Sequence, residues 1–324
     1  MSSIAGSKNL WRKFLPLAGL LVLIVIIHKI GFVNILDTIK DVCWSRLIIL
    51  PFLIISVFMV QTGKWNIILR LQRIEIEYKK LFQIIMIGMF YASFTPGQLG
   101  GFVKIKYLRD CSGRTLSECS SSILIDKVID LITLCFFAAL GSVILARHLY
   151  LIIIPFLIIP LLFTIVFIAL DKDRMAKIFR FILPTSLIPK KRKLKLGNAF
   201  NLFYRTIPKK KKLLLPFLLS MLTWLLIYTQ LFVVARAFFI NINYCIFIFI
   251  MPLVSLVALI PITVSGVGTR EAALLMILST YGVTPEKTVG MSLLNLVLCI
   301  YFPALIGGIL SIQSGIRHEN NFSE

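Results

Sequence analysis

The chain has 324 residues, of which 58% are hydrophobic and only 15% are charged. Soluble proteins are roughly 45–50% apolar and about 25% charged, so the composition excludes a soluble globular enzyme, a disordered chain and a coiled coil. The net charge of +21 would suggest nucleic acid in a soluble protein, but membrane proteins also collect Lys and Arg in cytoplasmic loops. We therefore expect a single all-α polytopic transmembrane domain over residues 1–324, without a nucleic-acid partner.

Eight apolar runs follow one another along the chain. Six of them are long enough to cross a hydrocarbon core of about 30 Å as a helix, and these are 14–30, 47–69, 120–145, 149–170, 213–239 and 289–312. The other two runs, 81–95 and 244–260, are shorter, and each stops at a proline that a glycine-rich stretch follows. The pattern predicts six full spans and two broken, re-entrant helical hairpins.

The distribution of charge predicts the orientation of these segments. Residues 171–212 hold 14 Lys and Arg against two Asp, a net charge of +12, and such segments stay in the cytoplasm. If both short runs enter and leave on one side, every basic loop lies inside, and 31–46 and 240–243 lie outside. We expect a multi-pass plasma membrane protein with both termini in the cytoplasm and 171–212 as a basic cytoplasmic connector. Eight plain spans are the alternative.

The two proline breaks share one pattern: a proline, three residues, a small residue, a glycine and a cation soon after. The candidate substrate-binding residues that form them are Pro96, Gly100, Gly101 and Lys104 in the first break, and Pro261, Ser265, Gly266, Gly268, Arg270 and Glu271 in the second. Each break lies within the same order of long span, short helix, break, short segment and long span. The sequence therefore predicts inverted repeats, about 47–145 and about 213–312.

A helix break inside a membrane has chemical consequences. Unwound backbone must be buried in protein or face water, because lipid cannot satisfy its N–H and C=O groups. Glycine allows unusual dihedral angles and close approach of a ligand, and the helix that starts after a break presents N–H donors and a positive dipole end. Secondary transporters bind substrates at paired breaks in inverted repeats. We therefore expect an anionic ligand, with a lipid phosphate as the simplest candidate; the alternative is that the breaks are only tight turns.

Four stretches of the sequence resemble the transmembrane region of the lysylphosphatidylglycerol synthases, over about residues 14–312. They are Pro96-x3-Gly100-Gly101-x2-Lys104, Ile125-Asp126-Lys127-x2-Asp130, Pro261-x3-Ser265-Gly266-x-Gly268-x-Arg270-Glu271 and Tyr281-Gly282-Val283. Stand-alone members of that family are called flippase-like membrane proteins. In the full synthases the membrane part flips a lipid that a separate soluble domain has aminoacylated. The resemblance implies lipid translocation, and because the chain ends at Glu324 without that domain we expect no aminoacyl transfer.

Charged residues within the apolar runs form a second candidate group. Asp126 and Asp130 are four residues apart and share one helix face, and Lys127 lies about 100° around the same helix. Because ionisable groups are costly at this depth, the three residues predict either a charge relay or an ion pair, with Lys104 or Arg270 as the partner. Lys64 and Arg236 lie near helix ends, and we expect them to extend toward the membrane surface.

Three functions are compatible with these features. The first is a flippase-like transporter that moves an anionic lipid or a lipid-linked head group. The second is a membrane-embedded enzyme that acts on lipid phosphates, for which Glu271 is the only acid in a break motif. The third is a non-catalytic membrane partner of a separate lipid synthase or glycosyltransferase subunit. The sequence has no HExxH motif, P-loop or CxxC pair, so we expect no metal or cofactor.

Overall fold

The computed structural model describes residues 22–95, 97–144, 171–182, 190–259 and 266–320, together with Pro160, Thr164 and Thr263. Every regular element in the described residues is a helix, which confirms the all-α prediction. The run predicted at 149–170 falls almost wholly outside the described residues. Pro96, Pro261 and Ser265 also lie outside them.

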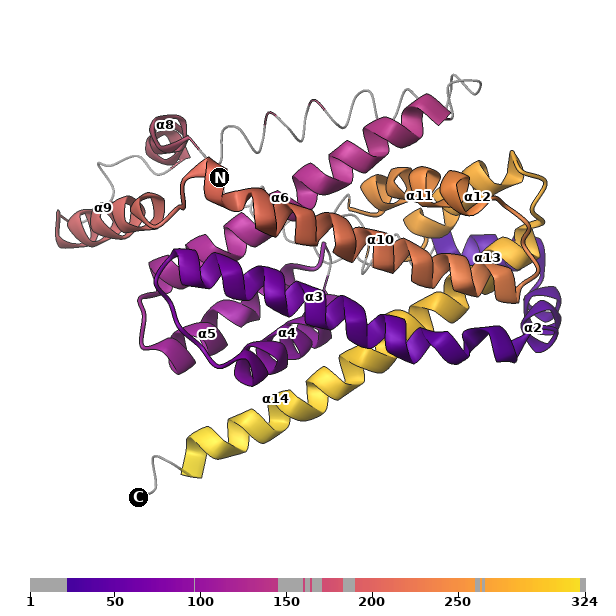
Figure 1. Cartoon of the computed structure of the whole chain (residues 1–324), viewed down its shortest axis with the longest axis horizontal. Helices are drawn as coiled ribbons and strands as arrows, with labels where there is room; N and C mark the ends of the chain where they lie inside the picture. The colour runs from indigo at the N-terminus through magenta and orange to yellow at the C-terminus, as the bar shows by residue number, and fades with distance from the viewer. Residues whose placement is uncertain are drawn as a thin grey trace, which may run out of the picture.

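The elements follow one another as short and long helices (Figure 1). In chain order they are α2 (Phe32–Lys40), η1 (Trp44–Ile49), α3 (Leu50–Leu71), α4 (Tyr78–Ser93), η2 (Leu99–Val103), α5 (Lys104–Ser112), α6 (Leu116–Ile144), α8 (Lys172–Ile182), α9 (Lys190–Arg205), η4 (Lys210–Leu213), α10 (Leu214–Ala237), α11 (Tyr244–Ala258), α12 (Thr269–Ser279), α13 (Pro285–Asn295), η5 (Leu296–Tyr301) and α14 (Phe302–Asn320). Two short helices, α4 and α11, end just before the residues predicted to break them.

Three of the continuous helical stretches, Trp44–Leu71, Lys211–Ala237 and Pro285–Gln313, are long and apolar enough to cross a membrane. A fourth candidate is the pair Val22–Ile30 and Phe32–Lys40, which is bent by 77°. Gly31 lies at this bend with a φ of 94°, a conformation that glycine adopts without a steric penalty. The chain is therefore a multi-pass membrane protein.

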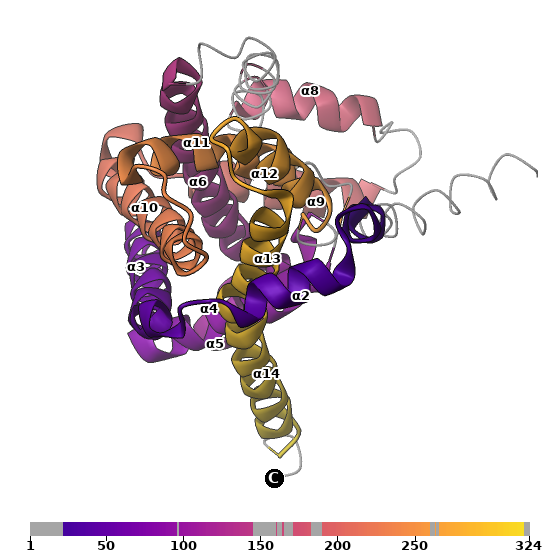
Figure 2. The ribbon, with the colours of Figure 1, turned by 90° about the vertical axis from the view of Figure 1, so that its right-hand side faces the viewer.

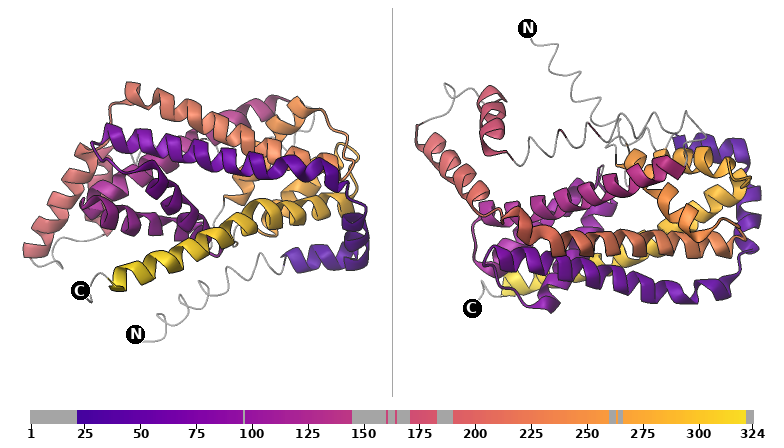
Figure 3. Two further views of the ribbon diagram at one scale, coloured as in Figure 1. Left: turned by 60° about the horizontal axis from the view of Figure 1, so that its bottom comes forward. Right: turned by 45° about the horizontal axis from the view of Figure 1, so that its top comes forward.

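The long helices pack in a crossed arrangement. Helices α3 and α10 lie side by side along the long axis (Figures 1 and 3). Helix α6 packs on α11, and α14 packs on α4. Both of these contacts need glycine, because a Cβ at Gly141 would lie 1.8 Å from the Phe249 carbonyl oxygen and one at Gly307 would lie 2.0 Å from that of Met86. The two helix pairs therefore approach each other at backbone distance.

Two hydrophobic cores fill the bundle. One core lies between α3, α4, α5 and the first part of α6, with Trp65 and Leu81 fully buried in it. The other core lies between α10, α11, α12 and α13. Leu134 in the second part of α6 belongs to the second core, whereas Leu310 of α14 packs against the first. The last helix of the first half, α6, thus extends into the second core, and the last helix of the second half, α14, packs against the first core.

The remaining helices lie at the two ends of the bundle. Helix α2 packs against α13 at one end (Figure 2), and α8 and α9 lie at the other end (Figure 3). Asp171 begins α8 by accepting the backbone N–H groups of Arg174 and Asp173, at 3.0 and 2.9 Å. These hydrogen bonds favour the carboxylate and hold the pKa of Asp171 below its usual range.

Candidate functional site

The first break begins where α4 ends, at Ser93. The Thr95 hydroxyl donates to the Tyr91 carbonyl at 3.0 Å and accepts the N–H of Gly100 at 2.7 Å. A Cβ at Gly100 would lie 2.1 Å from the Tyr91 carbonyl oxygen, and Gln98 adopts a left-handed φ of 56°. The chain therefore folds back tightly onto α4 before α5 starts, and Gly100 is required for that turn.

Lys104 is the first residue of α5, directly after the break. Its side chain lies against Gly88 of α4, where a Cβ would approach Lys104 Cγ to 2.5 Å. Its Nζ is 4.9 Å from the Trp65 ring centroid and 3.9 Å from Oδ2 of Asp126. Lys104 is thus a buried cation at a helix N-terminus whose nearest acidic partner is only loosely engaged.

The acids of α6 pair with a residue that we expected elsewhere. The Nζ of Lys64 lies 2.8 Å from Oδ1 of Asp126 and 2.5 Å from Oδ1 of Asp130, and the Ser220 hydroxyl donates to Asp130 at 2.6 Å. Lys64 is only 1% exposed, so the prediction that it extends to the membrane surface is wrong. The acids four residues apart on α6 face α3, and they hold the ammonium inside the bundle.

The other charged residues predicted in the spans lie apart from this cluster. Lys127 is exposed and forms no ion pair with the described residues. Arg236, near the end of α10, donates to the side-chain oxygen of Asn241 at 2.7 Å, and its carbonyl accepts from Arg46. Of the charged residues in the apolar runs, the structure therefore brings Lys64, Asp126 and Asp130 together, with Lys104 at the edge.

The second break leads from α11 into α12. Gly266 and Gly268 have φ values of +74° and +87°, which side chains rarely tolerate. A Cβ at Gly266 would also lie 2.9 Å from the Cβ of Ala258. The Thr269 hydroxyl donates to the Gly266 carbonyl at 3.1 Å and closes the turn. The two glycines thus allow α12 to begin close to the end of α11.

The carboxylate of Glu271 is fully buried beside this turn. Its Oε2 accepts the N–H of Gly268 at 2.6 Å, and its Oε1 accepts the Ser292 hydroxyl at 2.6 Å. The Arg270 guanidinium donates to the same Oε1, from Nη2 at 2.9 Å and from Nε at 3.2 Å, and also to the Ser292 carbonyl at 3.3 Å. Arg270 is therefore paired within the chain and is not a partner of the α6 acids.

Residues 13–307 match the sequence model of the lysylphosphatidylglycerol synthase TM region family. The chain belongs to this family. The match covers both breaks and every long helix described above except the end of the last one, and it confirms the resemblance seen in the sequence.

The chain is also similar to three UPF0104 membrane proteins over most of their lengths. The protein from Pyrococcus horikoshii is 25% identical over 292 residues, which cover 83% of this chain and 87% of that protein. The protein from Methanothermobacter thermautotrophicus is 22% identical, with 80% and 82% covered. The protein from Methanocaldococcus jannaschii is 21% identical, with 91% and 92% covered.

One element near the breaks was not predicted from the sequence. The stretch η5 (Leu296–Tyr301) is a π-helix inside the last long helix. Pro303 follows it and supplies the reason, since a proline in a helix lacks the N–H donor and crowds the carbonyl four residues before it. The apolar run hid this feature, and Pro303 was the signal that could have revealed it.

The last long helix, which contains η5, contacts both breaks. Tyr301 stacks on Phe94, the residue that directly follows α4, with ring centroids 5.9 Å apart and planes at 14°. Arg270 of the second break donates to the carbonyl of Ser292 on α13, about one helical turn before η5 begins at Leu296. The last long helix therefore contacts the first break at its π-helical stretch and the cation of the second break about one turn earlier.

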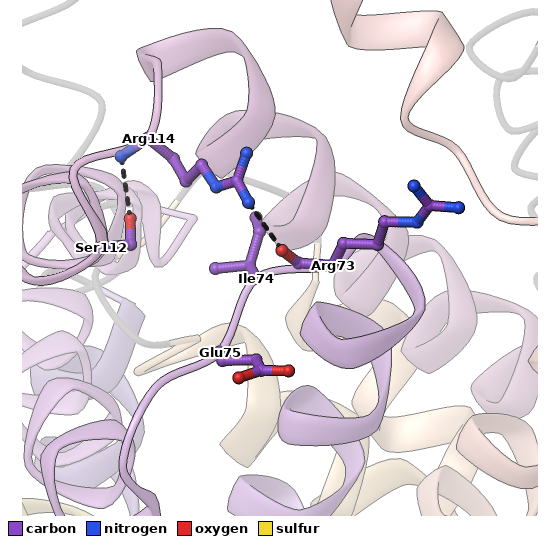
Figure 4. Close-up of a pocket in the computed structure, with 5 residues that line it drawn as sticks. All are labelled: Arg73, Ile74, Glu75, Ser112 and Arg114. Carbon is purple, nitrogen blue, oxygen red and sulfur yellow. Dashed lines mark hydrogen bonds between the residues drawn. The ribbon is translucent and has the colours of Figure 1, made fainter.

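A polar cleft of about 380 Å³ lies on the surface at the α5 end of the bundle, lined by Arg73, Ile74, Glu75, Ser112 and Arg114. Figure 4 shows the Arg114 guanidinium reaching the carbonyl of Arg73, at 2.8 Å. Arg73, Glu75 and Arg114 are exposed, so the cleft faces outward and is separate from the residues of the two breaks. Among the described residues no cluster of His, Cys, Asp or Glu has the arrangement of a metal site.

Proposed function

We propose that this chain is a flippase-like transporter that moves an anionic lipid or a lipid-linked head group across the membrane. One observation carries the proposal: two helix breaks are each followed at the start of a helix by a buried or nearly buried cation, and both breaks contact the last long helix at or about one turn before its π-helical stretch. The cations are Lys104, which is 9% exposed, and Arg270, whose side chain is 13% exposed. Helix N-termini and cations together favour phosphate.

The proposal includes an architecture of two inverted repeats, 47–145 and 213–312, with six full spans and two re-entrant hairpins. It is supported by contacts that occur in matched pairs. Helices α3 and α10 would be equivalent, and they pack on each other. The contact of α6 with α11 would correspond to that of α14 with α4, and each is made at a glycine, Gly141 or Gly307.

The direction of the chain in the membrane is part of the same proposal. The basic segment 171–212 contains α8 and α9, and these two helices lie at the same end of the bundle as α5. Because cytoplasmic loops accumulate Lys and Arg, we place this end and both termini in the cytoplasm, in the plasma membrane. A separate synthase or transferase subunit would then reach the protein from this side.

In this mechanism the breaks bind the polar head group. The acyl chains stay in the bilayer, beside the exposed apolar surface of the protein. Lys104 and Arg270 would bind the phosphate, while Gly100 and Gly266 allow the backbone to approach it. A membrane-embedded hydrolase would need a free carboxylate as a base. Glu271 is the acid at the breaks, and three donors already occupy its oxygens, so the geometry favours transport.

The proposal is tested with purified protein in phosphatidylcholine vesicles that contain a trace of fluorescent phosphatidylglycerol. A membrane-impermeant quencher added outside reports how much label reaches the outer leaflet. Lys104→Ala should slow translocation by roughly tenfold to a hundredfold, the scale of a hydrogen bond to a charged group. Lys106→Ala is the matched control, because this lysine lies on the same helix with an exposed side chain. Label that never crosses, or equal loss in both variants, would contradict the proposal.

A further inference from the structure

The second break already contains an anion, which is the carboxylate of Glu271. It lies at the N-terminus of α12 and accepts from a backbone N–H, a hydroxyl and a guanidinium, those of Gly268, Ser292 and Arg270. These are the kinds of donor that bind phosphate oxygens at helix N-termini. Glu271 therefore occupies the position that a phosphate would take in the proposed site.

The two breaks differ in this respect. At the first break, Lys104 lies 3.9 Å from the nearest carboxylate oxygen, which belongs to Asp126 on another helix. At the second, the Arg270 guanidinium makes two hydrogen bonds to Glu271 and a third to the Ser292 carbonyl. An anion that enters the site therefore meets a loosely paired cation at the first break. At the second break the cation is already bonded to the Glu271 carboxylate.

We propose that the Glu271 carboxylate is an internal counter-anion, and that it takes up a proton when the anionic head group binds at Arg270. This inference rests on the proposed transport function and concerns the regulation of the same site. Two anions cannot share one set of donors in a low-dielectric interior without strong repulsion. The proton comes from the aqueous solution. Because one carboxylate takes up one proton, a head group with a single negative charge leaves the net charge of the site constant.

The surroundings of Glu271 support this exchange. The elements packed against α12 are α11 and α13. Helix α11 carries no charged side chain, and Glu286 and Lys287 are half-buried in the first turn of α13. The charged group that contacts the carboxylate is Arg270 on its own helix. Among the described residues Glu271 is the acid paired with Arg270, so neutralising Glu271 leaves Arg270 without an acidic partner there.

The burial of the two side chains indicates where the head group arrives. Glu271 has no exposed surface, whereas the Arg270 side chain retains 13% of its own. Within this ion pair, the exposed surface therefore belongs to Arg270. A phosphate that contacts Arg270 would pull the guanidinium away from Glu271 and favour protonation of the abandoned carboxylate.

The experiment follows translocation of fluorescent phosphatidylglycerol in phosphatidylcholine vesicles from about pH 5 to about pH 8, the range over which raised carboxyl pKa values titrate. The wild-type rate should rise about tenfold or more as the pH falls. Glu271→Gln keeps the shape of the side chain without the charge, and its rate should be fast and independent of pH. Glu286→Gln changes a half-buried acid on α13 that, within the described part of the chain, forms no hydrogen bond or ion pair with Glu271 or Arg270; it is the control and should retain the wild-type profile.

Ser292→Ala provides a second variant if Glu271→Gln does not fold. It removes one donor from the carboxylate, so the midpoint of the pH profile should move to higher pH. An unshifted midpoint, a flat wild-type profile, or a wild-type profile in Glu271→Gln would overturn the inference while Lys104-dependent transport still stood. Absence of lipid movement in every variant at every pH would overturn the transport function, and this inference with it.

Discussion

The ammonium of Lys64 and the carboxylate of Asp126 lie 2.8 Å apart inside the helical bundle, and neither side chain is more than 8% exposed. Asp130 shares the same ammonium, and Lys104 approaches Asp126 from α5. Two lysines and two aspartates thus form a neutral cluster where α3, α5 and α6 meet. Charges at this depth are tolerated only with such partners.

Replacing Lys64 with Met should strongly destabilise the protein, because it leaves the buried carboxylate of Asp126 and the half-buried one of Asp130 with less compensating charge. Breaking a buried pair costs about 3–5 kcal/mol, which is measurable as a lower midpoint of thermal unfolding in detergent. Asp126→Asn and Asp130→Asn in the same chain should recover much of the loss. Lys127→Met is the control and should change stability by less than about 0.5 kcal/mol, since Lys127 is exposed.

The same variants separate the two functions predicted for the α6 acids. If Asp126 and Asp130 form a charge relay, Asp126→Asn should leave the protein folded and abolish the dependence of transport on an ion gradient. If they form a structural pair with Lys64, Asp126→Asn should lower the unfolding midpoint instead. Folded protein with unchanged gradient dependence would contradict both.

The close helix contacts predict which glycines are essential for folding. Gly307→Ala places a Cβ 2.0 Å from the Met86 carbonyl oxygen, so α14 must move away from α4, and a loss of at least about 1–3 kcal/mol is expected. Gly63→Ala is the control, because no atom lies within 4 Å of its added Cβ and alanine favours a helix by about 0.5–1 kcal/mol. Equal unfolding midpoints in the two variants would contradict the close packing of α14 on α4.

Two exposed native cysteines test the proposed orientation. Cys111 lies near the end of α5, and Cys245 lies near the start of α11. With the other cysteines replaced, a variant that retains Cys111 should react with an impermeant thiol reagent only from the cytoplasm. One that retains Cys245 should react only from outside. Labelling of both from one side would contradict the inverted-repeat architecture.

The helices could be predicted from the sequence, but their partners could not. The run predicted as a helix at 47–69 became a stretch from Trp44 to Leu71, because apolar length and turn residues are local signals. The burial of Lys64 depends on which face of α3 meets α6, and one sequence does not contain that information. The hydrogen bond from Ser292 to Glu271 joins residues on two helices, and no local pattern indicates it.

The candidate site shows the same limit. The glycines of both breaks were predicted, and the positive φ values of Gly266 and Gly268 explain why glycine stands there. Which acidic groups pair with the two cations was not predicted, since the position of a cation in the sequence does not reveal its partner in the fold. Arg270 is paired within the chain and Lys104 is only loosely paired, which makes the two breaks chemically unequal.

The final prediction concerns whether the two breaks act on the same ligand. Arg270→Ala should reduce translocation by about tenfold to a hundredfold, on the scale of one lost hydrogen bond to a charged group. Arg270→Lys should recover only part of this loss, because lysine is a point charge without the planar fork that binds two oxygens. Gly266→Val should be as damaging, since a β-branched residue cannot adopt a φ of +74° beside Ala258.

The control for general charge is the run of four lysines at 209–212. Changing all four to Gln removes more positive charge than any single variant, but the run lies in the basic connector outside the two breaks. Orientation or expression should change, because Lys and Arg in loops set topology, while turnover per correctly inserted molecule should stay the same. If this variant and Arg270→Ala lost turnover equally, surface charge would account for transport and the paired breaks would not. If Arg270→Ala and Lys104→Ala each lose turnover and the double variant loses little more, both cations act in one binding event.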